Sequence, residues 1–262
     1  MIIDMHSHIL PGIDDGAKDW EEFSAMAEVA VSEGVTHMVC TPHFIPRELE
    51  FDLNAYGDIF NKATQILTSQ GLQLTLIPGS EIFVSAGLAE SWQQGKLLSV
   101  NKGGKYLLVE FSRLDLPGFT RELLFELKLQ GVTPIIAHPE RNRAFMNKPQ
   151  LLVDLIEQGA LCQVNTGSIT GHFGEQVKKA ALEFLQGGMI HMIGTDAHSP
   201  RTRAPRVQQA LRVIQDLLGN EQLTELVEVN PLKVINGMEL EPYPIGLYQE
   251  KKSLWGRLIG GI

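Results

Sequence analysis

The sequence predicts a single α/β domain folded as a distorted (β/α)7 barrel, and two observations lead to this prediction. Short runs of apolar, often β-branched residues recur along the 262 residues, and helical spacing of apolar positions follows most of them. No linker rich in Pro, Gly or Ser interrupts the alternation, which indicates one domain. The alternation by itself suits a doubly wound sheet as well as a barrel.

Seven runs are expected to form strands. Their continuous apolar character is typical of strands buried on both faces, as in a parallel sheet. The runs cover residues 1–5, 35–41, 73–77, 106–111, 132–137, 161–165 and 189–194.

Amphipathic stretches between these runs are expected to form helices. In residues 17–33 the apolar side chains Trp20, Phe23, Ala27 and Val31 recur at helical spacing, and Gly34 follows as a glycine suited to the helix end. Similar stretches cover residues 120–130, 151–158 and 174–186.

Composition limits the classes of function. The net charge of -9 argues against a nucleic-acid binder that works through a broad basic surface. An anionic substrate stays possible because bound divalent cations would reverse the local potential. The two cysteines, Cys40 and Cys162, form no disulfide framework, and the start MIIDMHSH lacks the features of a secretory signal. A cytoplasmic protein without a transmembrane segment is expected.

Imidazole and carboxylate side chains follow almost every expected strand. In a barrel the ends of parallel strands gather at one mouth, so these side chains favour a barrel over a doubly wound sheet. The first strand carries an H-x-H pair, whose two rings point the same way. The candidate ligands are His6, His8, Asp15, His43, Glu81, Glu110, His138, Asp196 and His198.

The joint presence of these side chains indicates a metal site. Each alone is more often a hydrogen-bonded structural residue than a ligand. Burying so many ionisable groups without cations is costly, and bound metal ions would compensate them. Imidazole and carboxylate without thiolate suit Zn, Mn or Fe. The set fits two to three divalent metal ions, and two ions about 3.5–4 Å apart recur in phosphoester hydrolysis.

The ordered motifs IDMHSHILPGIDDG, CTPH, GSEIF, LLVEF, IIAHPER, QVN and GTDAH resemble a known family over residues 1–231. They are similar to the polymerase and histidinol phosphatase (PHP) superfamily. Within it they resemble the bacterial PHP-type protein tyrosine phosphatases of capsule and exopolysaccharide synthesis. The resemblance implies a TIM-like barrel with three divalent metals, often manganese, and a phosphotyrosine protein substrate. The expected partner is the tyrosine-rich tail of a bacterial tyrosine kinase.

The resemblance also implies how the ligands divide among the ions. The first ion would be held by His6, His8, Glu81 and Asp196, the second by the bridging Glu81 with Glu110 and His138, and the third by Asp15, His43 and His198.

Two arginines are expected to act in catalysis, where a metal-bridged hydroxide would attack phosphorus in line. Arg141 lies three residues after His138, and its planar guanidinium suits a fork on phosphate oxygens. Arg203 matches a phosphate-contacting arginine of the resembling family. The alternative for each is an ordinary surface arginine. A phenolate leaving group, with a pKa of about 10, needs no dedicated general acid.

Other functions compete with this interpretation. A thiol-based phosphatase needs five residues between Cys and Arg, whereas six separate Cys40 from Arg47, and no arginine closely follows Cys162. A metal-dependent amidohydrolase often carries a bridging lysine where this chain has Glu110, and Lys105 lies at the start of that strand. A structural metal is usually closed by four ligands, fewer than are present here. A small-molecule phosphomonoesterase of the histidinol phosphatase type and a nuclease stay open, although the negative charge disfavours the nuclease.

The chain is expected to divide into a catalytic barrel over residues 1–240 and a C-terminal tail over residues 241–262. The tail carries Lys251, Lys252, Trp255 and Arg257 among apolar residues. Packing on the barrel, assembly and contact with a membrane surface stay open for it. The sequence leaves the oligomeric state undetermined.

Overall fold

Parallel strands form the centre of the computed structural model, which describes residues 1–242. Within this range some strands of the barrel are continuous, and others are broken into two short strands. The continuous strands are β1 (Ile3–Ser7), β6 (Tyr106–Glu110), β7 (Thr133–Ala137), β8 (Leu161–Asn165) and β9 (Met192–Gly194). The broken ones are β2 (His37–Cys40) with β3 (His43–Phe44), and β4 (Thr75–Pro78) with β5 (Glu81–Phe83).

The strands close into a barrel. One sheet has the order β1-β2-β4 and the other the order β3-β5-β6-β7-β8-β9. Beyond the end of β9 the chain returns to β1, where Asp196 N donates to His6 O at 2.7 Å and His8 N donates to Ala197 O at 2.9 Å. The predicted distorted (β/α)7 barrel is therefore confirmed, and each expected strand run contains or overlaps one observed strand.

The breaks in two strands place two candidate ligands opposite each other. Pro42, between β2 and β3, has no N–H to continue the ladder. Gly79, between β4 and β5, lies so close to Val39 that an added Cβ would be 3.0 Å from its Cγ1. After these breaks β3 and β5 pair with His43 directly opposite Glu81. The short strands β3 and β5 were not among the sequence expectations.

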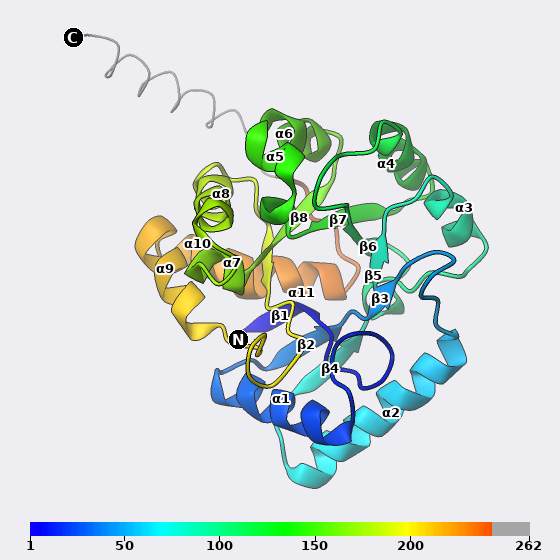
Figure 1. The fold of residues 1–262 in the computed structure, drawn as a ribbon, viewed down its shortest axis with the longest axis vertical. Helices are drawn as coiled ribbons and strands as arrows, with labels where there is room; N and C mark the ends of the chain where they lie inside the picture. Colours follow the sequence, from blue (N-terminus) through cyan, green and yellow to red (C-terminus); the bar gives the residue numbers. More distant parts are fainter. Residues whose placement is uncertain (243–262) are drawn as a thin grey trace.

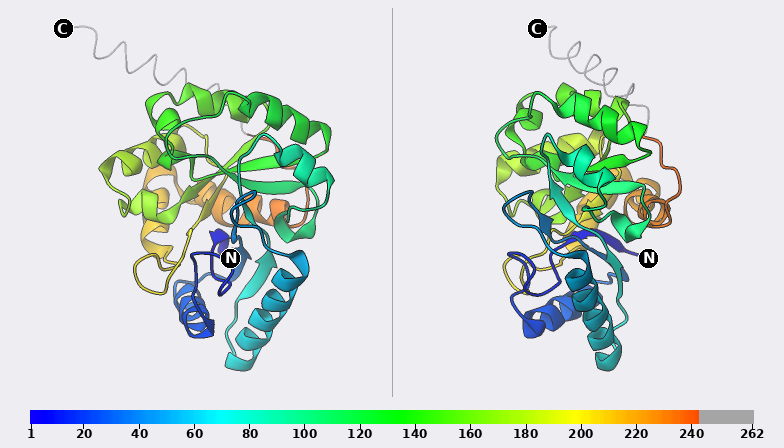
Figure 2. Two further views of the ribbon diagram at one scale, coloured as in Figure 1. Left: turned by 45° about the vertical axis from the view of Figure 1, so that its right-hand side comes forward. Right: turned by 90° about the vertical axis from the view of Figure 1, so that its right-hand side faces the viewer.

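Helices surround the strands as a ring, which Figure 1 shows along the shortest axis of the molecule and Figure 2 from two further sides. The longest of the helices in residues 1–242, α2, is capped by Asp52, whose carboxylate accepts from the backbone of Asn54 and Ala55. The larger helices are α1 (Trp20–Ser32), α2 (Leu53–Gln70), α4 (Thr120–Leu129), α6 (Gln150–Glu157), α8 (Glu175–Gln186) and α9 (Gln208–Leu218). Shorter ones are α3 (Leu88–Gln93), α5 (Arg143–Asn147), α7 (Thr166–Thr170), α10 (Asn220–Thr224) and α11 (Asn230–Ile235), with single turns at Val100–Lys102, Pro139–Arg141 and Glu225–Val229.

One end of the barrel is closed by the last described segment. At the start of β6, the hydroxyl of Tyr106 donates to Met238 O at 2.6 Å. Nearby, Asn101 Nδ2 donates to Ile235 O at 2.8 Å, which fixes α11 to the same end. The strands run away from this end in parallel, so their carboxyl ends meet at the opposite, open mouth.

Two apolar layers hold the barrel together. Along β6 successive side chains alternate between them, as the period of a strand requires. Tyr106 and Leu108 belong to the layer inside the barrel. Leu107 and Val109 belong to the larger layer between strands and helices. A strand covered on both faces explains the continuous apolar run in the sequence.

The expected helices are found close to their predicted bounds as α1, α4, α6 and α8, whereas α2 and α9 were not singled out from the sequence. Within residues 1–242 no helix combines the length and apolar character needed to cross a membrane. The predicted tail, 241–262, lies outside the described residues from position 243 onward.

Candidate metal centre

The candidate ligands gather at the carboxyl ends of the strands. Three groups can be drawn in which one ligand atom from each residue lies within 4.8 Å of the others. The groups are His6, His8, Glu81 and Asp196; His8, Asp15, His43 and His198; and His43, Glu81 and Glu110. His138 is in none of these groups but contacts the last one, since its Nε2 lies 2.9 Å from Glu81 Oε1 and 3.6 Å from Glu110 Oε1.

The first group is fully enclosed. His6 Nε2 lies 3.1 Å from His8 Nε2, and Glu81 Oε2 lies 3.1 Å from the former and 3.2 Å from the latter. Asp196 Oδ1 faces both rings at 3.6 and 3.5 Å. All four side chains are at most 2% exposed.

Two hydrogen bonds decide which nitrogens of His6 and His8 point into this group. His6 Nδ1 lies 2.9 Å from Gln163 Oε1, an acceptor, so it carries the proton and donates. His8 Nδ1 likewise donates to Asp14 Oδ2 at 2.6 Å. In the neutral rings both Nε2 atoms then present lone pairs to each other at 3.1 Å. A cation between them removes this repulsion, so the residues fit a metal ion.

The other two groups are more open. His43 Nδ1 lies 3.0 Å from Glu81 Oε2, yet both are buried atoms without a hydrogen bond of normal geometry. Asp15 is 67% exposed, and its Oδ1 lies 3.3 Å from His198 Nε2 and 3.6 Å from His43 Nε2. The ligand atoms of these two groups face a common space, and solvent reaches this space next to the exposed carboxylate of Asp15.

The charges of the cluster depend on one another. Burial alone would raise the pKa of Glu81, but His6, His138 and His43 hold that pKa well below its usual range. For Glu110, burial and the nearby Glu81 raise the pKa. Carboxylates of different basicity around several imidazoles are the donor set that divalent cations such as Zn, Mn and Fe accept.

The backbone is strained at two of the candidate ligands. His138 has φ 30° and Asp196 has φ 52°, both in the left-handed region that residues other than glycine rarely adopt. His138 follows β7 directly, and Asp196 follows β9 after one residue. Strain of this kind persists where the surrounding structure enforces it, typically at functional sites.

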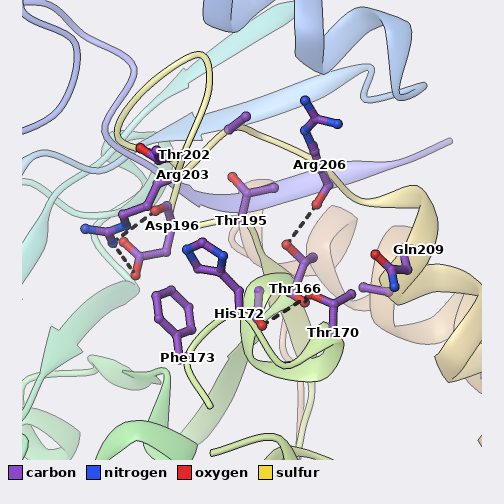
Figure 3. A pocket seen from close by; sticks show the side chains of 13 residues that line it. Thr166, Thr170, His172, Phe173, Thr195, Asp196, Thr202, Arg203, Arg206 and Gln209 are labelled. Atoms are coloured by element: carbon purple, nitrogen blue, oxygen red, sulfur yellow. Dashed lines mark hydrogen bonds and ion pairs between the residues drawn. The ribbon is translucent and has the colours of Figure 1, made fainter.

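Both predicted arginines lie at the cluster, but they contact a ligand. Arg141 Nη1 donates to Asp196 Oδ2 at 2.5 Å, and Arg203 Nη2 lies 2.8 Å from the same oxygen. Asn165 Nδ2 also donates to it, at 2.8 Å. Oδ2 is thereby held by three donors while Oδ1 faces the histidines. Figure 3 shows Arg203 beside Asp196.

Residues that the sequence prediction missed position the ligands. Gln163 links His6 to Asn165, whose Oδ1 accepts from Gln163 Nε2 at 2.9 Å. Asp14, next to the predicted Asp15, contacts His8 and also accepts from His43 N at 2.8 Å. In the sequence, the motif QVN and the two adjacent aspartates could have indicated these positioning roles, because polar side chains in buried segments need hydrogen-bonding partners.

Among residues 1–242, neither a cysteine nucleophile nor a bridging lysine lies at the cluster. Cys40 and Cys162 are 0% exposed, and burial raises the pKa of both thiols. Lys105 Nζ lies over the ring of Tyr106, at the end of β6 opposite to Glu110. The geometry therefore favours chemistry at the imidazole and carboxylate groups.

Comparison with known proteins agrees with this geometry. The chain is 36% identical over 231 residues to a tyrosine-protein phosphatase, YwqE of Bacillus subtilis, covering 87% of this chain and 91% of that protein. It is 32% identical to the putative tyrosine-protein phosphatase CapC of Staphylococcus aureus, covering 96% and 98%. A crystal structure from work on YwqE and on CpsB from Streptococcus pneumoniae, described as unique metal-dependent tyrosine phosphatases, superposes with a TM-score of 0.87 at 34% identity, covering 93% of this chain and 99% of that one. Residues 2–236 match the family described as capsular polysaccharide synthesis, CpsB/CapC, and the chain belongs to that family.

Proposed function

We propose that this protein is a metal-dependent phosphatase that removes phosphate from phosphotyrosine in proteins. The observation that carries the proposal is the opposed pair of Nε2 atoms of His6 and His8, 3.1 Å apart and both turned toward Glu81 and Asp196. The relatives named as tyrosine phosphatases support the substrate class. Family membership supports a role in capsule or exopolysaccharide synthesis.

The nine candidate ligands would hold two or three divalent ions. When bound, the ions would supply positive charge to the phosphoryl oxygens and lower the pKa of an attacking water. The contacts point to Glu81 as a residue that serves two ions, because it belongs to two of the groups and a carboxylate offers two oxygens. His8 also belongs to two groups, but its Nδ1 donates to Asp14, so its one free nitrogen can serve a single ion. Manganese is our first choice of metal and Fe or Zn are alternatives, because the ligands are imidazoles and carboxylates.

Arg141 and Arg203 would position the phosphoryl group. Each anchors one nitrogen on Asp196, which leaves further N–H groups of the guanidinium for the substrate. Arg141 is buried and Arg203 partly exposed. A phosphate beside them would receive charge-assisted hydrogen bonds, which strengthen as charge develops on the equatorial oxygens.

The proposed protein substrate is the tyrosine-phosphorylated tail of a bacterial kinase, and the proposed compartment is the cytoplasm. Two unpaired, buried cysteines suit a reducing compartment. We assign catalysis to the barrel of residues 1–240, in line with the family match over residues 2–236.

The test compares turnover by the manganese-loaded protein on four substrates. They are a phosphotyrosyl peptide, a phosphoseryl peptide, histidinol phosphate and an oligonucleotide. We expect kcat/KM to be highest for the phosphotyrosyl peptide. A clear preference for any of the other three would overturn the assignment, and histidinol phosphate would then indicate a small-molecule phosphomonoesterase.

A further inference from the structure

A polar cavity of about 190 Å³ lies beside the metal centre. It shares Asp196 and Arg203 with that centre and continues between the segment after β8 and the start of α9 (Figure 3). The part beyond Arg203, here called the side pocket, is lined by Thr166, Thr170, His172, Thr202, Arg206 and Gln209. The volume of the whole cavity is several times the roughly 30 Å³ that one water occupies in the liquid, so the cavity has room for a carboxylate or phosphate group.

The hydrogen-bonding capacity of the side pocket is unevenly used. The hydroxyls of Thr166 and Thr170 are engaged, because they donate to Arg206 O and to Thr166 O respectively. Within residues 1–242, by contrast, neither the guanidinium of Arg206 nor the imidazole of His172 has a hydrogen-bonding or ionic partner, and the Gln209 amide has none either. The pocket therefore offers unpaired donors at its rim.

One donor inside the site is also without a partner. Arg203 Nε is buried and forms no hydrogen bond, although Nη2 of the same side chain is paired with Asp196. Asp196 is the single carboxylate among the lining residues, and three donors already occupy its Oδ2. Although the whole chain carries a charge of -9, this cavity presents two arginines against one neutralised aspartate. The local potential is suited to an anion.

We propose that the side pocket binds a second anionic group of the substrate, a carboxylate or phosphate borne within a few residues of the phosphotyrosine. This inference rests on the proposed function and adds a sequence preference to it. Arg203 and Asp196 line the cavity and also belong to the metal centre, so an anion held in the side pocket would lie near a phosphoryl group at the metal centre. An extended peptide advances about 3.3 Å per residue, so a neighbouring side chain can reach from one site to the other.

Peptides of equal length that differ at one flanking position test the proposal. Each carries one phosphotyrosine and, at positions from three before to three after it, alanine, glutamate, lysine or a non-hydrolysable phosphonate mimic of phosphotyrosine. For the wild-type protein we expect kcat/KM for the best glutamate or phosphonate peptide to exceed that of the alanine peptide about three- to tenfold, and lysine to lower it. The ratio should shrink with added salt, because the pocket rim is solvent-exposed. Comparing the glutamate and phosphonate arms distinguishes a carboxylate from a second phosphate as the preferred ligand.

Variants of Arg206 test whether the side pocket causes the preference for acidic peptides. Arg206→Gln should bring the ratio of acidic to alanine peptide close to one, and Arg206→Glu should make the lysine peptide the better substrate. Arg212→Gln removes the same charge from an exposed position of α9 outside the pocket and should keep the wild-type ratio. Affinities of fully phosphonate-substituted peptides, measured by calorimetry, should follow the same order without any turnover.

Equal kcat/KM for acidic and alanine peptides in the wild-type protein would overturn the side pocket as an anion site. A preference that Arg206→Gln and Arg206→Glu both leave intact would overturn its location. Failure of the wild-type protein to hydrolyse any phosphotyrosyl peptide would instead overturn the proposed function, and the sequence preference with it.

Discussion

The Nδ1 atom of His6 lies 2.9 Å from the side-chain oxygen of Gln163, and both residues are fully buried. This contact fixes the ring so that Nε2 points to His8, Glu81 and Asp196. The tautomer of a metal-binding histidine is commonly set by such a partner on its other nitrogen. Gln163 is itself held in place, because its Nε2 donates to Asn165.

Replacing Gln163 tests whether this contact prepares the metal site. We expect Gln163→Leu to weaken metal binding about 10- to 100-fold, the usual effect of removing a partner of a metal ligand. Gln163→Glu keeps an acceptor for His6 Nδ1–H and should bind metal better than the leucine variant. Competition with a chromogenic chelator measures the affinity. Equal affinity of the wild-type and leucine proteins would contradict the role.

The ring of Phe173 supports the buried arginine of the site. The guanidinium carbon of Arg141 lies 4.4 Å from the centre of this ring. A cation–π contact that is shielded from water contributes about 0.5–2 kcal/mol, so Phe173→Leu should lower kcat/KM for an aryl phosphate about 2- to 30-fold. Phe173→Tyr keeps the aromatic face and should stay near the wild-type value. Equal losses in both variants would mean that the aromatic face is not the cause.

Space for Phe173 depends on a glycine. A Cβ added at Gly167 would lie 3.0 Å from Phe173 Cε2. Gly167→Ala should therefore displace the ring and lower kcat/KM in the same direction as Phe173→Leu. Because both changes act through one contact, the double variant should lose less than the product of the single losses. Fully multiplicative losses, from kcat/KM of all four proteins, would contradict a shared cause.

Thiol chemistry should have no part in turnover. Cys40 and Cys162 are fully buried, and burial raises the pKa of each thiol, so the reactive thiolate is scarce. We expect iodoacetamide to leave phosphotyrosine hydrolysis unchanged under native conditions. The Cys40→Ala and Cys162→Ala proteins should also stay active. Inactivation by iodoacetamide in wild type that either substitution prevents would contradict this expectation.

His191 should make stability depend on pH independently of the metal. It is fully buried just before β9, and burial lowers its pKa to about 4, compared with about 6.5 in an unfolded chain. The unfolded state therefore binds a proton that the folded state refuses. As the pH falls from 6.5 toward 4.5, the free energy of unfolding should drop by about 2–3 kcal/mol because of this residue.

The matched variant is His191→Asn, whose side-chain oxygen can still accept from Cys162 N as His191 Nδ1 does at 3.1 Å. It has no proton to bind in this range, so its urea-unfolding free energy should fall less steeply between pH 6.5 and 4.5. Both proteins are measured in the presence of a chelator. The difference between their free energies of unfolding separates the effect of His191 from that of the other titrating groups. Parallel pH curves would exclude His191 as the source.

The sequence predicted the longer strands well because strands covered on both faces have a continuous apolar pattern, and the ligands at the strand ends favoured a barrel over a doubly wound sheet. It missed β3 and β5, since segments of two or three residues beside Pro42 and Gly79 are too short for any periodicity. The candidate ligands could be picked from strand ends, and the structure brings all of them to one mouth. Their division among ions stays a prediction. His43, which the resemblance assigned with Asp15 and His198, also lies 3.0 Å from Glu81.

The positioning residues were harder to predict because their roles arise from contacts between distant segments. Gln163 and His6 are 157 residues apart, and Arg141 and Asp196 are 55 apart. Asp14 and Asp15 are adjacent in the sequence, yet one is buried against His8 and the other is exposed at the mouth. Spacing along the chain carries no information about such differences in burial.

The central claim is that phosphotyrosine hydrolysis requires metal ions at the cluster around Glu81. The most direct measurement is the rate of phosphate release from a phosphotyrosyl peptide by chelator-treated protein, before and after manganese is restored, beside the Glu81→Gln and His138→Ala proteins. We predict almost no release without metal, recovery with manganese in the wild-type protein, and rates at least about 100-fold lower in both variants. Undiminished release by the metal-free protein, or wild-type rates in either variant, would contradict the account.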